Sequence, residues 1–180
     1  MQWSCCLLGH ELEKETGEPF ERYSSRITKL LPSFPTDVIE QWLYRHNSDF
    51  IKKFTHLPLS SFDFRLSRFS NEDFTLIKLF DRDYEYYLDA GKNLLGDPII
   101  RERGLGHIML KRGSFPCPVI VFEGFNLHQD YAGENFLAPF HLVEGHRRWA
   151  FLRTMIKFSE TSMIPALLEE HEVFRVTLRT

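Results

Sequence analysis

Hydrophobic positions follow a helical spacing in the first half of the chain and a strand-like pattern in much of the second. Between about residues 19 and 95, apolar side chains recur at intervals of three, four and seven, which is typical of helices that bury one face. The clearest helical stretch begins at Thr36 and Asp37 and runs to Phe54. A shorter stripe at 27–31 precedes it and is stopped by the prolines that follow.

Three other features complete the expected N-terminal portion. Residues 9–19 are polar and acidic, so we expect a loop or a loosely held end there. The alternation at 62–66 favours a short strand, with an extended loop as the alternative. Ser70 and Asp73 have the spacing of an N-cap pair, and they predict a helical region that continues, with an interruption at 81–83, toward Gly96.

The second half predicts a small sheet. Glycine and proline are frequent between 96 and 118, which indicates a long connection with one short helix at 107–110. Continuous apolar runs at 118–122 and 140–143 predict two buried neighbouring strands, joined by a loop at 124–139 whose length favours a functional role. A helix is expected after Gly145, a short helix at 165–168, and a closing strand at 173–178.

The predicted fold is therefore α+β, or α/β-like, in a single domain spanning residues 1–180. A helical N-terminal portion, about 19–95, packs on a small mixed sheet within a core at about 96–180. With 43% hydrophobic and 14% aromatic residues, the 180-residue chain has enough apolar surface for one compact aromatic core.

Charge narrows the classes of partner. The net charge is -3; residues 1–90 hold 11 basic against 15 acidic side chains, and residues 91–180 hold 11 against 10. Direct nucleic-acid binding is not supported by this charge, because a duplex surface needs a clearly positive face. Cys5, Cys6 and Cys117 form no spaced framework, and the N-terminal sequence resembles neither a signal peptide nor a membrane span. We therefore expect a cytoplasmic protein with reduced thiols.

The segment 142–150 carries the strongest chemical signal, because it joins a strand to a helix through glycine. A helix N-terminus presents unpaired N–H groups and a partial positive charge. Gly145 lets an anion approach the backbone, His146 can donate to phosphate, and Arg148 offers a fork of donors beside Arg147. Glu144 caps the helix or, alternatively, holds magnesium. The competing explanation is that both arginines form ordinary ion pairs and that His146 only packs.

Residues 118–121, followed after a loop by 141–152, resemble the core of the ParB/sulfiredoxin-like superfamily, in which a strand leads into a G-[EH]-x-R box that opens a helix. The resemblance covers about residues 117–156 and is closest to the uncharacterised G-H-x-R branch. It implies nucleotide-phosphate binding at Gly145, His146 and Arg148, with Arg147 at the variable position. Other branches hydrolyse nucleotides, transfer phosphate, reduce oxidised cysteine or cut nucleic acid.

The departures from that superfamily restrict the function. Sulfiredoxins have cysteine where this chain has Gly145, so thiol chemistry would require another cysteine to reach the box. ParB partition proteins have glutamate at the position of His146, together with an arginine-rich box and a helix-turn-helix domain that this sequence lacks.

Other motifs carry weaker signals. His128, Asp130, His141 and His146 include the residue types of a metal site but have no helical ligand spacing. Gly91-Lys92 and Gly104-Leu-Gly106 do not match the phosphate-binding glycine motifs.

The expected function is nucleotide or phosphate binding by a ParB-like domain, with phosphotransfer or nucleotide hydrolysis as a possible extension. Glu144 and His146 are the candidate catalytic residues. Glu123, Asp130 or Glu144 would hold Mg²⁺ with the nucleotide or act as a general base. The alternatives are a non-catalytic interaction or immunity-type protein whose acidic N-terminal half binds a protein partner, and a nucleic-acid-processing enzyme. No membrane association is expected.

Overall fold

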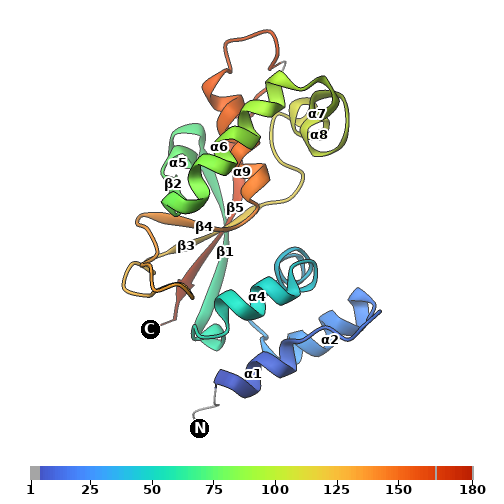
Figure 1. Ribbon diagram of the computed structural model, residues 1–180, viewed down its shortest axis with the longest axis vertical. Helices are drawn as coiled ribbons and strands as arrows, with labels where there is room; N and C mark the ends of the chain where they lie inside the picture. Colours follow the sequence, from blue (N-terminus) through green and yellow to red (C-terminus); the bar gives the residue numbers. More distant parts are fainter. Residues whose placement is uncertain (1–4, 165, 180) are drawn as a thin grey trace. The chain divides into compact units, whose positions relative to one another are not determined.

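The computed structural model describes residues 5–164 and 166–179, which form an α+β protein with a five-stranded mixed sheet (Figure 1). The predicted fold class is confirmed. Among these residues there are two compact units: unit 1 comprises 5–64, 124–136 and 176–179, and unit 2 comprises 65–123 and 137–175. The boundaries fall inside the strands β1 (Phe62–Ser70) and β5 (Glu170–Leu178).

Unit 1 consists mainly of short helices. They are α1 (Cys5–Leu12), α2 (Phe20–Leu30), α3 (Thr36–Val38), the π-helical turn η1 (Ile39–Tyr44), α4 (Asn47–Phe54) and the 3-10 turn η2 (Leu59–Ser61). The predicted continuous helix from Thr36 to Phe54 is thus divided before α4. Its apolar face is buried as expected, because the Trp42 ring lies edge-on to Phe50 and Phe54, with centroid distances of 4.9 and 4.8 Å.

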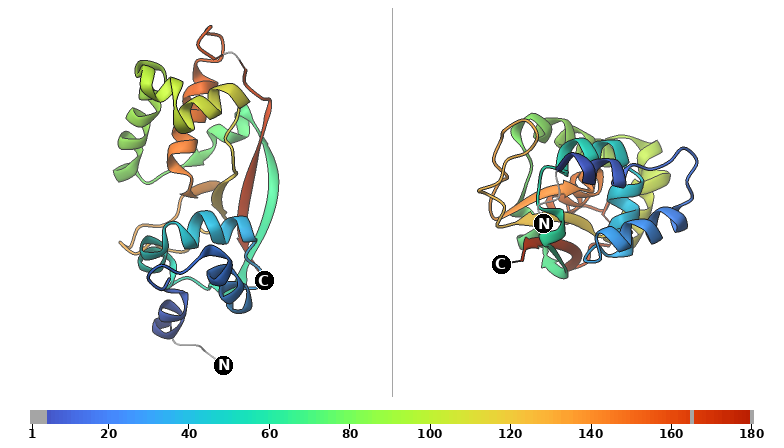
Figure 2. Two further views of the ribbon diagram at one scale, coloured as in Figure 1. Left: turned by 90° about the vertical axis from the view of Figure 1, so that its right-hand side faces the viewer. Right: turned by 90° about the horizontal axis from the view of Figure 1, so that it is seen from below.

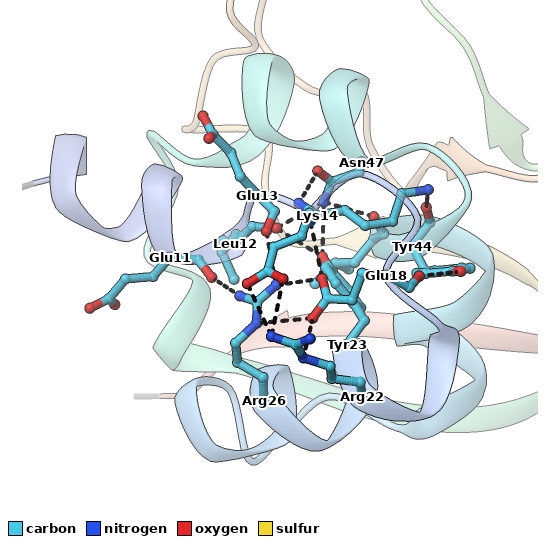
Figure 3. A network of polar contacts seen from close by, with 12 residues as sticks. Glu11, Leu12, Glu13, Lys14, Glu18, Arg22, Tyr23, Arg26, Tyr44 and Asn47 are labelled. Carbon is cyan, nitrogen blue, oxygen red and sulfur yellow. Dashed lines mark hydrogen bonds and ion pairs between the residues drawn. The ribbon is translucent and has the colours of Figure 1, made fainter.

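The segment 13–19 is held by polar contacts around the buried side chain of Glu18 (Figure 3). The carboxylate of Glu18 accepts hydrogen bonds from Arg26 Nη2 at 3.0 Å and from the Glu15 N–H at 3.2 Å, and Arg26 also donates to Glu13 O at 2.8 Å. Burial acts to raise the pKa of Glu18, but these hydrogen bonds and the nearby guanidinium charges outweigh it, so the pKa lies below its usual value. The expected loop is therefore present at 13–19, but it is not loosely held, and residues 9–12 belong to α1.

The sheet has the strand order β1-β5-β3-β4-β2. Strand β3 (Val119–Glu123) pairs antiparallel with β4 (Phe140–Glu144), placing Val121 opposite Leu142, and the short β2 (Ile77–Lys78) pairs parallel with β4. Figure 2 shows the long strands β1 and β5 side by side. The two buried strands predicted from the apolar runs are confirmed, as is the closing strand.

The helices of unit 2 are α5 (Asn71–Thr75), α6 (Asp81–Gly96), α7 (Pro98–Glu102), α8 (Gly104–Arg112) and α9 (His146–Lys157). Ser70 and Asp73 form the expected capping box at α5. The helical region expected after Ser70 instead contains β2 between α5 and α6. The stretch 96–118 holds two helices where a long connection with one was expected. At the predicted short helix 165–168, Pro165 lies outside the described residues and 166–168 are irregular.

Helices α6 and α9 lie side by side (Figure 1). Their backbones approach closely at Gly91. A Cβ atom at Gly91 would lie 2.6 Å from Thr154 Oγ1 and 2.7 Å from Ala150 O, so only glycine permits this separation of the backbones. Trp149 and Leu152 of α9 are completely buried in the apolar core that this face makes with β3, β4 and β5. The close approach fixes the middle of α9, at Ala150 and Thr154, against α6.

Candidate functional site

Strand β4 passes directly into α9 through Gly145, which has φ +92°. This left-handed conformation favours glycine. A Cβ atom there would also lie 2.7 Å from Val119 Cγ1 and 2.9 Å from Arg148 Nη2. The glycine of the box is therefore required by the turn and by close packing.

The side chain of Arg148 points from this turn into the protein interior. Its Nη1 donates to Cys117 O at 3.0 Å, lies 3.3 Å from Pro118 O and contacts Cys117 Sγ, while Nη2 lies 3.4 Å from a carboxylate oxygen of Glu144. Only 8% of Arg148 is exposed. The guanidinium thus ties α9 to the chain before β3, an arrangement that differs from the expected phosphate-facing fork. Cys117 is brought beside the box by the same contacts.

His146 lies on the other side of the turn and stacks on Tyr87 of α6, with ring centroids 4.8 Å apart and an interplanar angle of 28°. Burial raises the pKa of Tyr87, and the charges of Asp83 and Glu144 act in the same direction, whereas Arg147 acts to lower it. The phenol is therefore a neutral group at physiological pH. The structure brings Glu144, His146 and Arg147 together around this side of the α9 N-terminus, although Glu144 is engaged with Arg148.

Arg147 points in a different direction from Arg148 and lines a cleft of about 520 Å³ within unit 2. We call this space the arginine cleft, because Arg103, which precedes α8, lines it as well. Both arginines are exposed, and within the described part of the chain neither one makes an ion pair. The remaining walls come from α6, α7, α8 and α9 and include Tyr86, Asp89, Asn93, Ile99, Leu105 and Phe151.

The electrostatics of the arginine cleft favour an anion. Its one lining carboxylate, Asp89, is already paired with Lys92, whose Nζ lies 2.7 Å from Asp89 Oδ1. Two guanidinium groups therefore remain to be balanced, and guanidinium matches phosphate or carboxylate through paired hydrogen bonds. Sequence reasoning identified Arg147 but missed Arg103, which is distant in sequence and belongs to no recognisable motif.

The magnesium candidates do not fit a metal site. Glu123 forms a two-pronged ion pair with Arg175, with Arg175 Nε 3.0 Å from Glu123 Oε2. Asp130 belongs to unit 1, where its Oδ1 accepts from the N–H groups of Ala132 and Glu134, each at 2.9 Å. Residues 5–164 and 166–179 contain no group of three or more side chains placed to hold a metal ion. The candidate residues therefore do not support Mg²⁺ binding.

A second polar group of unit 2 lies in the core and was not identified from the sequence. His171 Nδ1 lies 2.8 Å from Ser114 Oγ, and His171 Nε2 lies 2.9 Å from Asn71 Oδ1. Since Asn71 Nδ2 donates to Leu168 O, its Oδ1 accepts from Nε2–H, and the serine hydroxyl donates to Nδ1. Burial lowers the pKa of His171 to about 4. The His171 ring packs against Phe74. The serine, histidine and asparagine side chains therefore have a structural role in the core.

Comparisons with protein-family models, with curated proteins and with solved structures gave no match. The resemblance of the Gly145 box to the ParB/sulfiredoxin-like superfamily accordingly stays a prediction. Among the helices of the described residues, none combines the length and the apolar character needed to cross a bilayer.

Proposed function

We propose that unit 2 binds a phosphorylated small molecule, such as a nucleotide, in the arginine cleft. The observation that carries this proposal is the meeting of Arg147, from the first turn of α9, with Arg103 in one cleft of about 520 Å³. This volume lies within the range of small-molecule sites, and two guanidinium groups without an ion pair among the described residues suit a phosphate group.

The proposal keeps the ligand class expected from the box and changes the residues that contact the ligand. Arg147 faces the ligand, whereas Arg148 and Gly145 shape the turn that presents Arg147. His146 supports the same turn by stacking on Tyr87. The proposed function is binding, because Glu144 is paired with Arg148 and, among the residues described, Asp89 is the one carboxylate that lines the cleft and no histidine lines it.

A thermal-shift measurement on the full chain tests this function with the four common nucleoside monophosphates and triphosphates. A ligand at 100 times its Kd stabilises the folded state by about 2.7 kcal/mol, which raises Tm by roughly 5–10 °C. Arg103→Ala and Arg147→Ala should each abolish the shift. Arg112→Ala is the matched control, because Arg112 is an exposed arginine in the last turn of α8, away from the cleft.

Absence of any shift would refute the proposal and favour the non-catalytic interaction protein expected as the alternative. Retention of the thermal shift in both cleft variants would show that the ligand binds at another site.

A further inference from the structure

We infer that the ligand of the arginine cleft is a nucleoside 5′-monophosphate, bound through one dianionic phosphate and an apolar face of the nucleoside. The inference rests on the proposed function and names the class of ligand within it.

Charge balance sets the number of phosphate groups. Asp89 is neutralised by Lys92, so Arg103 and Arg147 supply two uncompensated positive charges to the arginine cleft. A phosphate monoester carries about two negative charges at neutral pH, since its second pKa is about 6. One terminal phosphate therefore balances the two guanidinium groups.

A triphosphate fits this lining less well. Its additional charge would need further cations, which phosphate-binding proteins supply through lysine and Mg²⁺. Glu144, beside the Gly145 turn, is engaged with Arg148, and Glu123, at the opposite end of the β3–β4 pair, is paired with Arg175. Extra phosphate groups in the cleft would remain poorly compensated, and uncompensated charge is costly to remove from water.

The apolar part of the cleft favours a ligand that carries an apolar group as well as a phosphate. Ile99, Leu105 and Phe151 line the cleft, and Ile99 is 68% exposed. Tyr86 contributes an exposed ring at the rim. Covering this apolar surface favours binding of a flat heteroaromatic base. Asn93 adds an amide that can both donate to and accept from the base or sugar.

Cyclic nucleotides provide the matched control ligands. A 3′,5′-cyclic monophosphate has the same base and ribose, with the 3′-oxygen joined to the phosphate, and it holds a single charge at every pH of interest. We expect at least one of the four 5′-monophosphates to bind about fivefold or more tightly than its cyclic counterpart at pH 7.5, because one charge-assisted contact is lost. The same monophosphate should bind more tightly than its triphosphate, with or without Mg²⁺.

Isothermal titration calorimetry on the full chain measures these affinities at pH 7.5 and pH 5.0. The ratio between 5′-monophosphate and cyclic ligand should approach one at pH 5.0, where the monoester becomes singly charged. The ionisable groups that line the cleft are Tyr86, Asp89, Arg103 and Arg147. Lys92 pairs with Asp89, and His146 precedes Arg147 in the sequence. All of these groups are the same for both ligands, so the change of the ratio with pH reports the protonation of the ligand. Arg147→Ala should remove the preference, and Arg112→Ala should retain it.

The outcomes separate the inference from the proposed function. Tighter binding of the triphosphate, or a ratio of one at pH 7.5, would overturn the inference while phosphate binding stands. Binding of no nucleotide at all would overturn both.

Discussion

Acidification should weaken unit 2 through the buried ring of His171. This side chain is 1% exposed, and its pKa is lowered from 6.5 to about 4 by burial. Since the folded pKa lies below the unfolded value, the unfolded chain takes up the proton first as the pH falls. The stabilising contribution of the neutral ring is complete above pH 6.5 and is lost progressively toward pH 4.

The magnitude follows from the two pKa values. A gap between 6.5 and about 4 corresponds to roughly 3 kcal/mol in total, at about 1.4 kcal/mol per pH unit. Between pH 7.5 and pH 5.5 the expected loss in the free energy of unfolding is roughly 1.3 kcal/mol. Stopping at pH 5.5 keeps most carboxylates ionised, because their ordinary pKa values are about 4.

Urea unfolding at pH 7.5, 6.5 and 5.5, followed by tryptophan fluorescence, measures this loss. His171→Gln keeps a donor and an acceptor but removes the titration, so its free energy of unfolding should fall by roughly 1.3 kcal/mol less over the interval. His107→Gln changes an exposed histidine of α8 and should follow the unmodified protein. Equal slopes for the unmodified protein and His171→Gln would show that burial does not keep this ring neutral.

Three further substitutions, two of them with a matched control variant, test the packing and the charges. Gly91→Ala should destabilise unit 2 by about 1–3 kcal/mol in thermal unfolding, whereas Gly96→Ala in the same helix meets open space and should not. Arg148→Met should cost about 2–3 kcal/mol in urea unfolding because carbonyls lose their donor, and Arg147→Met should cost less than about 0.5 kcal/mol. Glu18→Gln should lower stability at pH 7 by up to about 3 kcal/mol; the lowered pKa predicts that the difference shrinks as the pH falls below 4.5, and a pH-independent difference would contradict it.

The sequence predicted features whose cause is local. The strands at 119–123 and 140–144 follow from unbroken apolar runs, and the capping box follows from the spacing of Ser70 and Asp73. Both signals lie within a few residues of the structure that they specify. The α+β class followed from the same local patterns.

The missed features depend on partners distant along the chain. Segment 13–19 is polar and has no periodic pattern, yet Arg26 and Asn47 hold its backbone; Asn47 Oδ1 accepts from the Lys14 N–H at 2.9 Å. The predicted helix at 107–110 is shorter than α8 (Gly104–Arg112), because glycines such as Gly104 and Gly106 are typical of loops that connect helices and strands. Gly106 instead permits close packing, since a Cβ atom there would collide with Ile100 O.

The same distinction explains why the candidate site was only partly predictable. Adjacent positions in a helix point about 100° apart, so Arg147 and Arg148 cannot both point toward the same ligand. When one of them faces the packed core, the other faces away from it. Both residues are arginines, so the sequence does not tell them apart. The position of α9 in the tertiary structure decides which arginine is buried. Because Gly91 fixes α9 against α6, Arg148 reaches the Cys117 and Pro118 carbonyls while Arg147 remains in the arginine cleft. The two methionine variants should therefore separate stability from ligand binding: Arg148→Met should lower the free energy of unfolding, and Arg147→Met should lower nucleotide affinity. A loss of both properties in both variants would contradict this division.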